Sequence, residues 1–398
     1  MSARTLHIGI DATSWQNDRG FGRFTRELVT ALAARHMGFR YTLLFDRTPL
    51  EGGPPGVGVI SATTRHTLVE SAVGTTSRSI GYLWKVGKLA RQAQFDLFFF
   101  PSVYSYFPIV ARVPCVVCYH DTTAERFPEL VFPTKLNQRL WQLKTLLARF
   151  QTTRAMTVSR TSARDLEEVL RIPSRKIDVV TEGADPVFRV NIDGVTSDKA
   201  RIQYRIPTGV DLLVYVGGIN PHKNLLSLLK SLPTILSHRP ETHLAIVGDT
   251  SGKGFWDNVA EVKGFVERNP PLDKHVHFTG YITDPALADL LNGASALVFP
   301  SLWEGFGLPA VEAMSCGLPV LASRRGSLPE IVGDAGLFFE PEDPSDIAKC
   351  VLQFLNDSDL RTRLRDLALK RVKTFSWELA AELAEECFRR CHREARRD

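Results

Sequence analysis

Short apolar runs alternate with longer amphipathic segments along most of the chain, and this alternation is typical of α/β proteins. In the first half, the apolar runs predict strands at 6–10, 41–45, 96–100, 113–119, 155–158 and 177–180. In the second half, they predict strands at 212–216, 243–247, 275–279, 296–299 and 319–322. Helical spacing fills the intervals; Phe24, Leu28 and Leu32, for example, predict the buried stripe of a helix over about 21–36. We therefore expect two parallel sheets, each covered by helices.

The apolar pattern fades after residue 186 and returns near Asp211, which predicts a linker between two domains. We place the first domain at residues 1–188 and the second at residues 189–376. A chain of 398 residues, 44% of them hydrophobic, is long enough to bury two cores of this size.

The composition is that of a protein outside the secreted and membrane-spanning classes. The N-terminus leads directly into the first predicted strand, so we expect no secretory signal. The longest uncharged run, 97–111, is interrupted by Pro101 and Pro108 and is too short to span a bilayer. Cys115 and Cys118 lie in a predicted strand, which favours a core position over a zinc site or a disulfide. We expect a soluble, cytoplasmic protein.

The net charge of +5 is modest, but it is unevenly distributed. Between Leu130 and Arg164 there is no acidic residue, whereas the basic residues are Lys135, Arg139, Lys144, Arg149, Arg154, Arg160 and Arg164. Within this segment, apolar residues recur at helical spacing: Leu136, Leu140, Leu143, Leu147 and Phe150. Two interpretations stay open. The first domain contacts the inner face of an anionic membrane, or the segment is an ordinary amphipathic helix whose polar face is basic by chance.

A glycine-rich loop with two carboxylates follows the predicted strand 296–299. Glu304 projects from this loop, and Glu312 from a short helix for which Pro309 is the expected first residue and Gly317 the expected left-handed cap. A carboxylate accepts hydrogen bonds from two neighbouring hydroxyls, such as those of a ribose or a hexose. The alternative is that the two glutamates merely sit near a helix N-terminus, where negative charge is favourable.

Residues 301–320 closely resemble the donor-sugar motif of glycosyltransferase family 4, whose members are retaining nucleotide-sugar transferases of GT-B fold. The family pattern E-G-F-G-L-P-x-x-E-A-x-A-x-G-x-P-V is matched here with seven residues between Glu304 and Glu312, except that Ser315-Cys316 replaces the commoner Ala-x pair. The resemblance implies two Rossmann-like domains whose parallel sheets face each other across a cleft. It further implies that a last helix, residues 377–398, returns to complete the first domain.

A second segment, residues 215–224, reads as a strand, a glycine turn and the start of a helix. The amides near Gly217 and Gly218 are suited to a phosphate, and Lys223 supplies a point charge for the leaving group. The family's equivalent lysine contacts the donor diphosphate, but Gly218 stands where many members have an arginine. Charge stabilisation would then rest more on Lys223, with His222 assisting. The alternative is a solvated lysine at a helix start.

Two further segments match the family in the first half of the chain. The loop with Gly20, Gly22 and Arg23 resembles one that faces the donor phosphate, although a plain turn would also explain its glycines. His120 ends a predicted strand, where the family places a histidine beside the transferred sugar. The competing interpretation of His120 is a core histidine satisfied by backbone.

The remaining donor contacts follow from the resemblance. Glu304 would bind the hexose together with the loop residues Gly305, Phe306, Gly307 and Leu308. Glu312 would bind the ribose, and Tyr281 and Ile282 would border the nucleobase. Glu330 also matches a family position, without an assigned role.

These residues and the family resemblance together imply a retaining hexosyltransferase. No residue is nominated as a nucleophile, and the resemblance favours same-face attack. We expect the donor to be a nucleoside-diphosphate sugar, with GDP-mannose slightly favoured over a glucosyl or rhamnosyl donor, and the acceptor to be a hydroxyl of a glycan or a lipid-linked acceptor. We expect no cofactor beyond this co-substrate, no metal and no nucleic-acid partner, since no Asp-x-Asp metal motif flanks a suitable strand. The alternatives are a nucleotide-sugar epimerase of the same fold and a catalytically silent scaffold subunit.

Overall fold

The computed structural model describes residues 4–17, 20–35, 37–46, 52–61, 88, 93–109, 112–191, 200–251 and 257–396. The chain divides into two compact units. Unit 1 comprises residues 1–128, 132–182 and 376–398, and unit 2 comprises residues 129–131 and 183–375. The main division therefore follows Glu182, whereas the sequence placed it after residue 188.

Unit 1 is built on a parallel sheet of seven strands in the order β3-β2-β1-β4-β5-β6-β7. The strands are β1 (Leu6–Asp11), β2 (Phe39–Phe45), β3 (Gly58–Ser61), β4 (Leu97–Phe100), β5 (Cys115–Cys118), β6 (Thr152–Thr157) and β7 (Ile177–Val179). The helices are α1 (Gly20–Arg35), α4 (Thr123–Arg126), α6 (Lys135–Gln151), α7 (Arg160–Glu168) and α17 (Trp377–Glu394). The short helix α5 (Pro128–Val131) falls almost wholly within the residues of unit 2.

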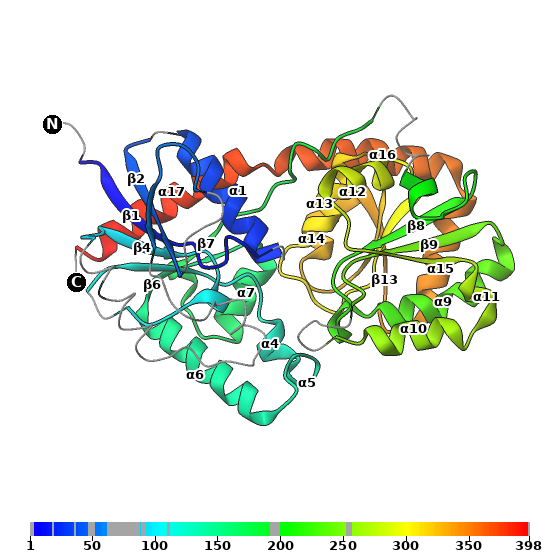
Figure 1. Ribbon diagram of the computed structural model, residues 1–398, viewed down its shortest axis with the longest axis horizontal. Helices are drawn as coiled ribbons and strands as arrows, with labels where there is room; N and C mark the ends of the chain where they lie inside the picture. The colour runs from blue at the N-terminus through cyan, green and yellow to red at the C-terminus, as the bar shows by residue number, and fades with distance from the viewer. Residues whose placement is uncertain are drawn as a thin grey trace. The chain divides into compact units, whose positions relative to one another are not determined.

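Unit 2 has a parallel sheet of six strands in the order β10-β9-β8-β11-β12-β13. The strands are β8 (Asp211–Val216), β9 (Thr242–Val247), β10 (Val276–Gly280), β11 (Ala296–Phe299), β12 (Val320–Ser323) and β13 (Gly336–Phe339). The helices are α9 (Leu225–His238), α10 (Val259–Glu267), α11 (Pro270–Asp273), α12 (Asp284–Asn292), α13 (Leu308–Ser315), α14 (Leu328–Val332), α15 (Pro344–Asn356) and α16 (Ser358–Arg371). Helices α9 and α10 cover one side of the sheet, and α12 and α13 cover the other (Figure 1).

All eleven predicted strands are present, with ends that shift by up to three residues. The two strands that the sequence did not predict, β3 and β13, both begin with glycine and lie at the edge of their sheets. An edge strand pairs with only one neighbouring strand and is less enclosed than a central strand. Its sequence therefore does not need a long apolar run. The doubly wound α/β architecture predicted from the alternating pattern is confirmed in each unit.

Helix α17, which follows the last residues of unit 2 in the sequence, belongs to unit 1 and lies beside α1 (Figure 1). Its Phe388 ring meets Phe99 of β4 at a centroid distance of 5.2 Å. Buried Arg154 of β6 is bonded to Asp178 of β7 at 2.6 Å and to Glu394 of α17 at 2.5 Å. Breaking such a pair leaves an uncompensated buried charge, so this cluster fixes α17 on the sheet.

The six cysteines are all buried and free, and Cys115 and Cys118 lie within β5, as the sequence analysis favoured. Among the described residues, no helix combines the length and the apolar character that crossing a bilayer would require.

Three histidines gather at the start of β9 and β10. Nδ1 of His243 lies 2.9 Å from Nε2 of His277, and the His243 ring also packs 4.7 Å from the ring of His275. Burial, followed by the neighbouring His277, His275 and Arg201, lowers the pKa of His243 to about 4. The folded chain therefore holds this imidazole neutral at a pH at which the unfolded chain would protonate it.

We predict that this histidine makes unit 2 less stable in mild acid. Folding lowers the pKa of His243. The contribution of the neutral imidazole to the free energy of unfolding is therefore complete above the unfolded pKa of 6.5 and is lost as the pH falls from 6.5 towards 4. Between pH 7.5 and pH 5 the free energy of unfolding, measured by urea denaturation, should fall less in His243→Gln than in the unchanged protein. The difference should be on the order of 1 kcal/mol. Exposed His238 on α9 offers the control, and an equal pH dependence in His243→Gln and His238→Gln would contradict the prediction.

Candidate functional site

The two carboxylates predicted from the sequence lie around the loop between β11 and α13. The residue before α13, Gly307, has a φ of 100°, so it turns the chain in a left-handed conformation that suits glycine. Pro309 is the second residue of the helix, not the first as expected, because Leu308 already has helical geometry. Gly317 has a φ of 70° and ends the helix in the predicted left-handed conformation.

Lys223 comes from a different loop, which follows β8. After Gly217 and Gly218 the chain makes a single 3-10 turn, Pro221–Lys223, and Asn224 then adopts left-handed angles with a φ of 56° before α9 begins at Leu225. Lys223 therefore ends a turn and does not start the long helix, which corrects the sequence prediction. Asparagine tolerates this conformation better than most residues, which allows the sharp change of direction.

The structure brings Lys223 and Glu304 together. Nζ of Lys223 donates a hydrogen bond of 2.6 Å to Oε1 of Glu304, and the two side chains are 21% and 12% exposed. They come from the loops after β8 and β11, which are neighbours at the point where the strand order of the sheet reverses. In open α/β sheets this point at the carboxyl ends of the strands is where ligands bind.

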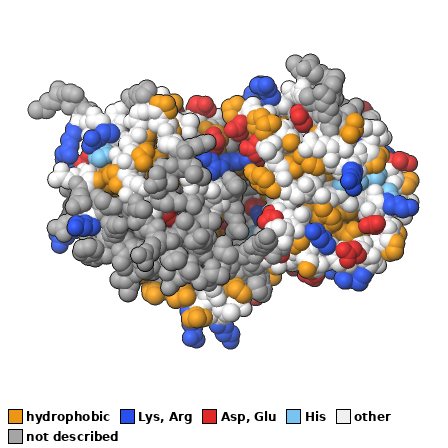
Figure 2. All heavy atoms as spheres, in the orientation of Figure 1, with side chains coloured by type: hydrophobic (Ala, Val, Ile, Leu, Met, Phe, Trp, Pro, Cys, Tyr) orange, Lys and Arg blue, Asp and Glu red, His pale blue; other side chains and the backbone are white. Residues whose placement is uncertain are grey.

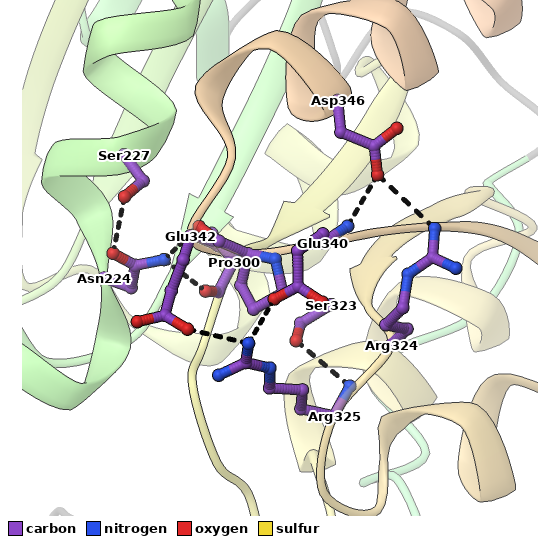
Figure 3. A network of polar contacts seen from close by, with 10 residues as sticks. Asn224, Ser227, Pro300, Ser323, Arg324, Arg325, Glu340, Glu342 and Asp346 are labelled. Atoms are coloured by element: carbon purple, nitrogen blue, oxygen red, sulfur yellow. Dashed lines mark hydrogen bonds and ion pairs between the residues drawn. The ribbon is translucent and has the colours of Figure 1, made fainter.

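Backbone contacts fix the turn that carries Lys223 against the end of β11. The N–H of Leu302 donates to the carbonyl of His222 at 2.8 Å. Nδ2 of Asn224 donates to the carbonyls of Pro300, at 3.1 Å, and Pro341, at 2.6 Å (Figure 3). A single amide side chain thus joins the turn to two other loops of unit 2.

The far side of the Glu304 loop is held by the segment that follows β12. Gly326 has a φ of 62°, and a Cβ atom there would lie 2.9 Å from the backbone nitrogen of Glu304, so only glycine fits without displacement. The N–H of Ser327 donates to the carbonyl of Glu304 at 3.2 Å, and its buried hydroxyl donates to the carbonyl of Phe306 at 2.8 Å. Glu304 is therefore positioned from both sides.

An ion-pair network continues this support to the loop after β13. The Arg325 guanidinium bonds Glu340 at 2.5 Å and Glu342 at 2.7 Å, while Asp346 accepts from the Glu340 backbone and pairs with Arg324 (Figure 3). The loops after β12 and β13 are thereby joined.

The other predicted donor residues of unit 2 differ in exposure. Glu312 is 3% exposed within α13, and Phe306 is equally buried, with its ring edge against Phe375 at 5.5 Å. Tyr281 is 65% exposed and Ile282 is buried, directly after Gly280 at the end of β10. All of these residues follow the carboxyl ends of strands, and a hydrogen bond joins Lys223 to Glu304.

In unit 1, the predicted glycine loop opens α1 at Gly20. A Cβ atom on Gly22 would lie 1.9 Å from the carbonyl oxygen of Asn17, so the first turn of the helix packs too closely on the preceding loop for any side chain there. Arg23 is partly buried in this turn, and Arg19 lies outside the described residues. The close approach explains Gly22 by packing alone, and the phosphate contact of Arg23 stays a prediction.

His120 is the second residue after β5, one residue further from the strand than the sequence predicted. Its Nε2 lies 2.9 Å from the carbonyl oxygen of Pro101, and its Nδ1 lies 3.6 Å from Oε1 of Glu182. Burial lowers the pKa of the imidazole, but Cys118 and Glu182 more than offset this effect, so the pKa of His120 lies well above its usual value. Both ring nitrogens thus have partners within unit 1, and the ring favours its charged form.

Sequence reasoning missed the residues that hold the site in place. Gly326 and Ser327 lie against Glu304 from another loop, Asn224 joins the Lys223 turn to two other loops, and Arg325 joins the loops after β12 and β13; no local pattern reports such contacts. The usable signals were weak: an asparagine directly after a predicted phosphate lysine, and a glycine between two strand-like segments.

The comparisons with known proteins agree with this geometry. Residues 19–188 match the family described as Glycosyltransferase Family 4, and residues 196–371 match the family described as Glycosyl transferases group 1. The O-antigen chain mannosyltransferase B of Escherichia coli is 38% identical over 165 residues, which are 42% of each chain. The serotype-specific mannosyltransferase WbdA of Escherichia coli is 31% identical over 249 residues, 61% of this chain but 30% of the relative. The chain thus spans less than half the length of these two relatives.

Among solved structures, HepE of Anabaena in complex with UDP-glucose superimposes with a TM-score of 0.74 at 18% identity, covering 96% of this chain and 99% of that chain. The fold of the chain is GT-B, and its two halves each match a glycosyltransferase family. The Glycosyltransferase Family 4 match lies largely in unit 1, and the Glycosyl transferases group 1 match lies in unit 2.

We predict that Asn224 positions Lys223 for the transfer step. Asn224→Asp keeps the size and the tolerance for left-handed angles but cannot donate to the carbonyls of Pro300 and Pro341. Turnover should fall about tenfold, because small displacements of a catalytic group are costly. Asn224→Gly keeps only the backbone and should behave alike.

Ser227→Ala is the control, since it removes only the hydroxyl that donates to Oδ1 of Asn224. It should change turnover less than about twofold. Steady-state kinetics with circular dichroism would separate this role from misfolding. Full turnover in folded Asn224→Gly would contradict it.

Proposed function

We propose that the protein is a retaining hexosyltransferase. It would move a hexose from a nucleoside-diphosphate sugar to a hydroxyl of a glycan or a lipid-linked glycan, with unit 2 binding the donor and unit 1 the acceptor. The observation that carries the proposal is the bond between Lys223 and Glu304 at the switch point of the unit 2 sheet.

The paired side chains suit a donor that has a charged and a hydroxylated end. A lysine ammonium has three donors, so Lys223 can keep its bond to Glu304 and still donate to a phosphate oxygen. Glu304 likewise retains a second carboxylate oxygen for a sugar hydroxyl. The pair would therefore fix the diphosphate and the hexose relative to each other. Buried Glu312 would accept from the ribose hydroxyls, and exposed Tyr281 would border the base.

In the reaction, the bond between the anomeric carbon and the diphosphate oxygen breaks, and its electron pair stays on the phosphate. Lys223 and the amides at the start of α13 would stabilise this growing charge. The acceptor oxygen attacks the anomeric carbon from the same face and passes its proton to the departing phosphate oxygen. Attack on that face retains the anomeric configuration without an enzyme nucleophile.

The sugar and the base are proposed on narrower grounds. Both curated relatives described above are named mannosyltransferases, which supports a mannosyl donor and hence a guanosine nucleotide. HepE binds UDP-glucose, so a uridine donor is the alternative to test. A lipid-linked acceptor would be reached at a membrane, and we include peripheral membrane contact in the proposal.

The function is tested by incubating the protein with GDP-mannose, UDP-glucose and dTDP-rhamnose in turn, with glycan and lipid-linked acceptors. We expect free nucleoside diphosphate and a glycoside of retained configuration, measured by chromatography and NMR. Lys223→Ala should lower turnover about 100-fold, and exposed Lys230→Ala on α9 should not. An epimerised nucleotide sugar without a glycoside would indicate an epimerase, and binding without either product would indicate a scaffold.

We further predict that Glu312 acts in nucleotide binding. Glu312→Ala should weaken the binding of the preferred nucleoside diphosphate by at least about 100-fold, because two hydrogen bonds to a charged acceptor are lost. Isothermal titration calorimetry measures the change directly. Glu267→Ala, at an exposed carboxylate at the end of α10, should bind as the unchanged protein does. Equal affinities for all three proteins would reject the ribose contact.

A further inference from the structure

Helix α6 of unit 1 carries its apolar side chains on the outside. Six large hydrophobic residues of this helix are between 40% and 76% exposed: Leu136, Leu140, Leu143, Leu146, Leu147 and Phe150. Together they are more than half of the exposed large hydrophobic residues found in the described part of the chain. We call them the α6 stripe. Helices at the surface of a globular unit usually turn such a face to the core.

The packing face of α6 is the opposite one. Thr145 and Ala148 are the buried residues of the helix, and partly buried Trp141 donates from Nε1 to Glu125 at 2.7 Å. Trp141, Thr145 and Ala148 are spaced by four and three residues, as are Leu136, Leu140 and Leu143, but on the other side of the helix. The apolar stripe is therefore turned outward by the packing of the helix and not by a loose fit.

The charge around the stripe has one sign. Helix α6 contains Lys135, Arg139, Lys144 and Arg149 and no acidic residue. Lys135 and Arg139 are exposed in its first turns, and Arg149 bonds the carbonyl of Leu170 at its last turn. Figure 2 shows hydrophobic side chains with Lys and Arg beside them where α6 lies in Figure 1.

We propose that the α6 stripe is a docking surface for an anionic lipid bilayer. The apolar side chains would enter the acyl boundary while the flanking cations meet lipid phosphates, which is how interfacial amphipathic helices bind. A second copy of this chain is disfavoured as the occupant, because two α6 helices would bring the exposed Lys135 and Arg139 of both copies together, and the helix carries no acidic residue. The proposal rests on the membrane contact included in the proposed function and names the surface that would make it, and it does not depend on the donor site.

Flotation with lipid vesicles tests the proposal on the full chain. Vesicles of phosphatidylcholine alone are compared with vesicles containing 30% phosphatidylglycerol, roughly the anionic fraction at which basic helices bind. We expect the protein to float with the anionic vesicles, and to float less at high salt. Leu140→Gln with Phe150→Gln should lower the bound fraction at least about tenfold, and Lys135→Gln with Arg139→Gln should lower it on anionic vesicles.

Ile202→Gln is the matched control, because Ile202 is 69% exposed in unit 2 and should leave flotation unchanged. Nucleoside-diphosphate binding, measured on the same variants, should be unaltered, which separates this result from the donor site. Two outcomes overturn the proposal: the unchanged protein stays with the soluble fraction, or it forms a dimer that Phe150→Gln dissociates in light-scattering measurements.

Discussion

The candidate site depends on how a parallel sheet reverses its order. In unit 2, β8 and β11 are neighbours, but the next strands along the chain lie on opposite sides of them. The connections from their carboxyl ends therefore leave in opposite directions, and the two loops are free to carry polar side chains between them. Lys223 and Glu304 use this position and form a bond although 81 residues separate them in the sequence. The same reversal occurs in unit 1 between β1 and β4, and there Phe21 of the glycine loop stacks on Tyr104 at 5.8 Å.

An ion pair that is mostly removed from water is an expensive contact, because desolvation offsets much of its attraction. The structure supports this pair with neutral bonds: the amide of Asn224 on two carbonyls, and the backbone of Ser327 on Glu304. These bonds hold the two loops whether or not the charges are satisfied. These neutral bonds thus keep the two loops in place, so the charges of Lys223 and Glu304 stay available to a ligand.

The sequence predicted the elements of this arrangement better than its supports. Apolar runs located eleven strands, and the spacing of Glu304 and Glu312 with their glycines identified the loop, because these signals are local. Asn224 could not be predicted, since its partners Pro300 and Pro341 are distant in the chain. Helix α6 shows a second limit: periodicity reveals an apolar face but not whether that face is turned inward, which here depends on Trp141, Thr145 and Ala148.

The charge balance of the loops bears on how a diphosphate would be held. Lys223 and Glu304 cancel each other, so the pair alone supplies little net positive field. The N-terminus of α13 contributes a partial positive charge of roughly half a unit, carried by amides with no partner inside the helix. Glycine at positions 307 and 326 allows the N-terminal end of α13 and the loop after β12 to come close to neighbouring atoms that a side chain would displace. Backbone dipoles, brought near by glycine, would therefore carry a large share of the electrostatic work, with Lys223 directing one oxygen. Under the proposed function, this division would allow Gly218 to stand where many members of the family that the sequence resembles have an arginine.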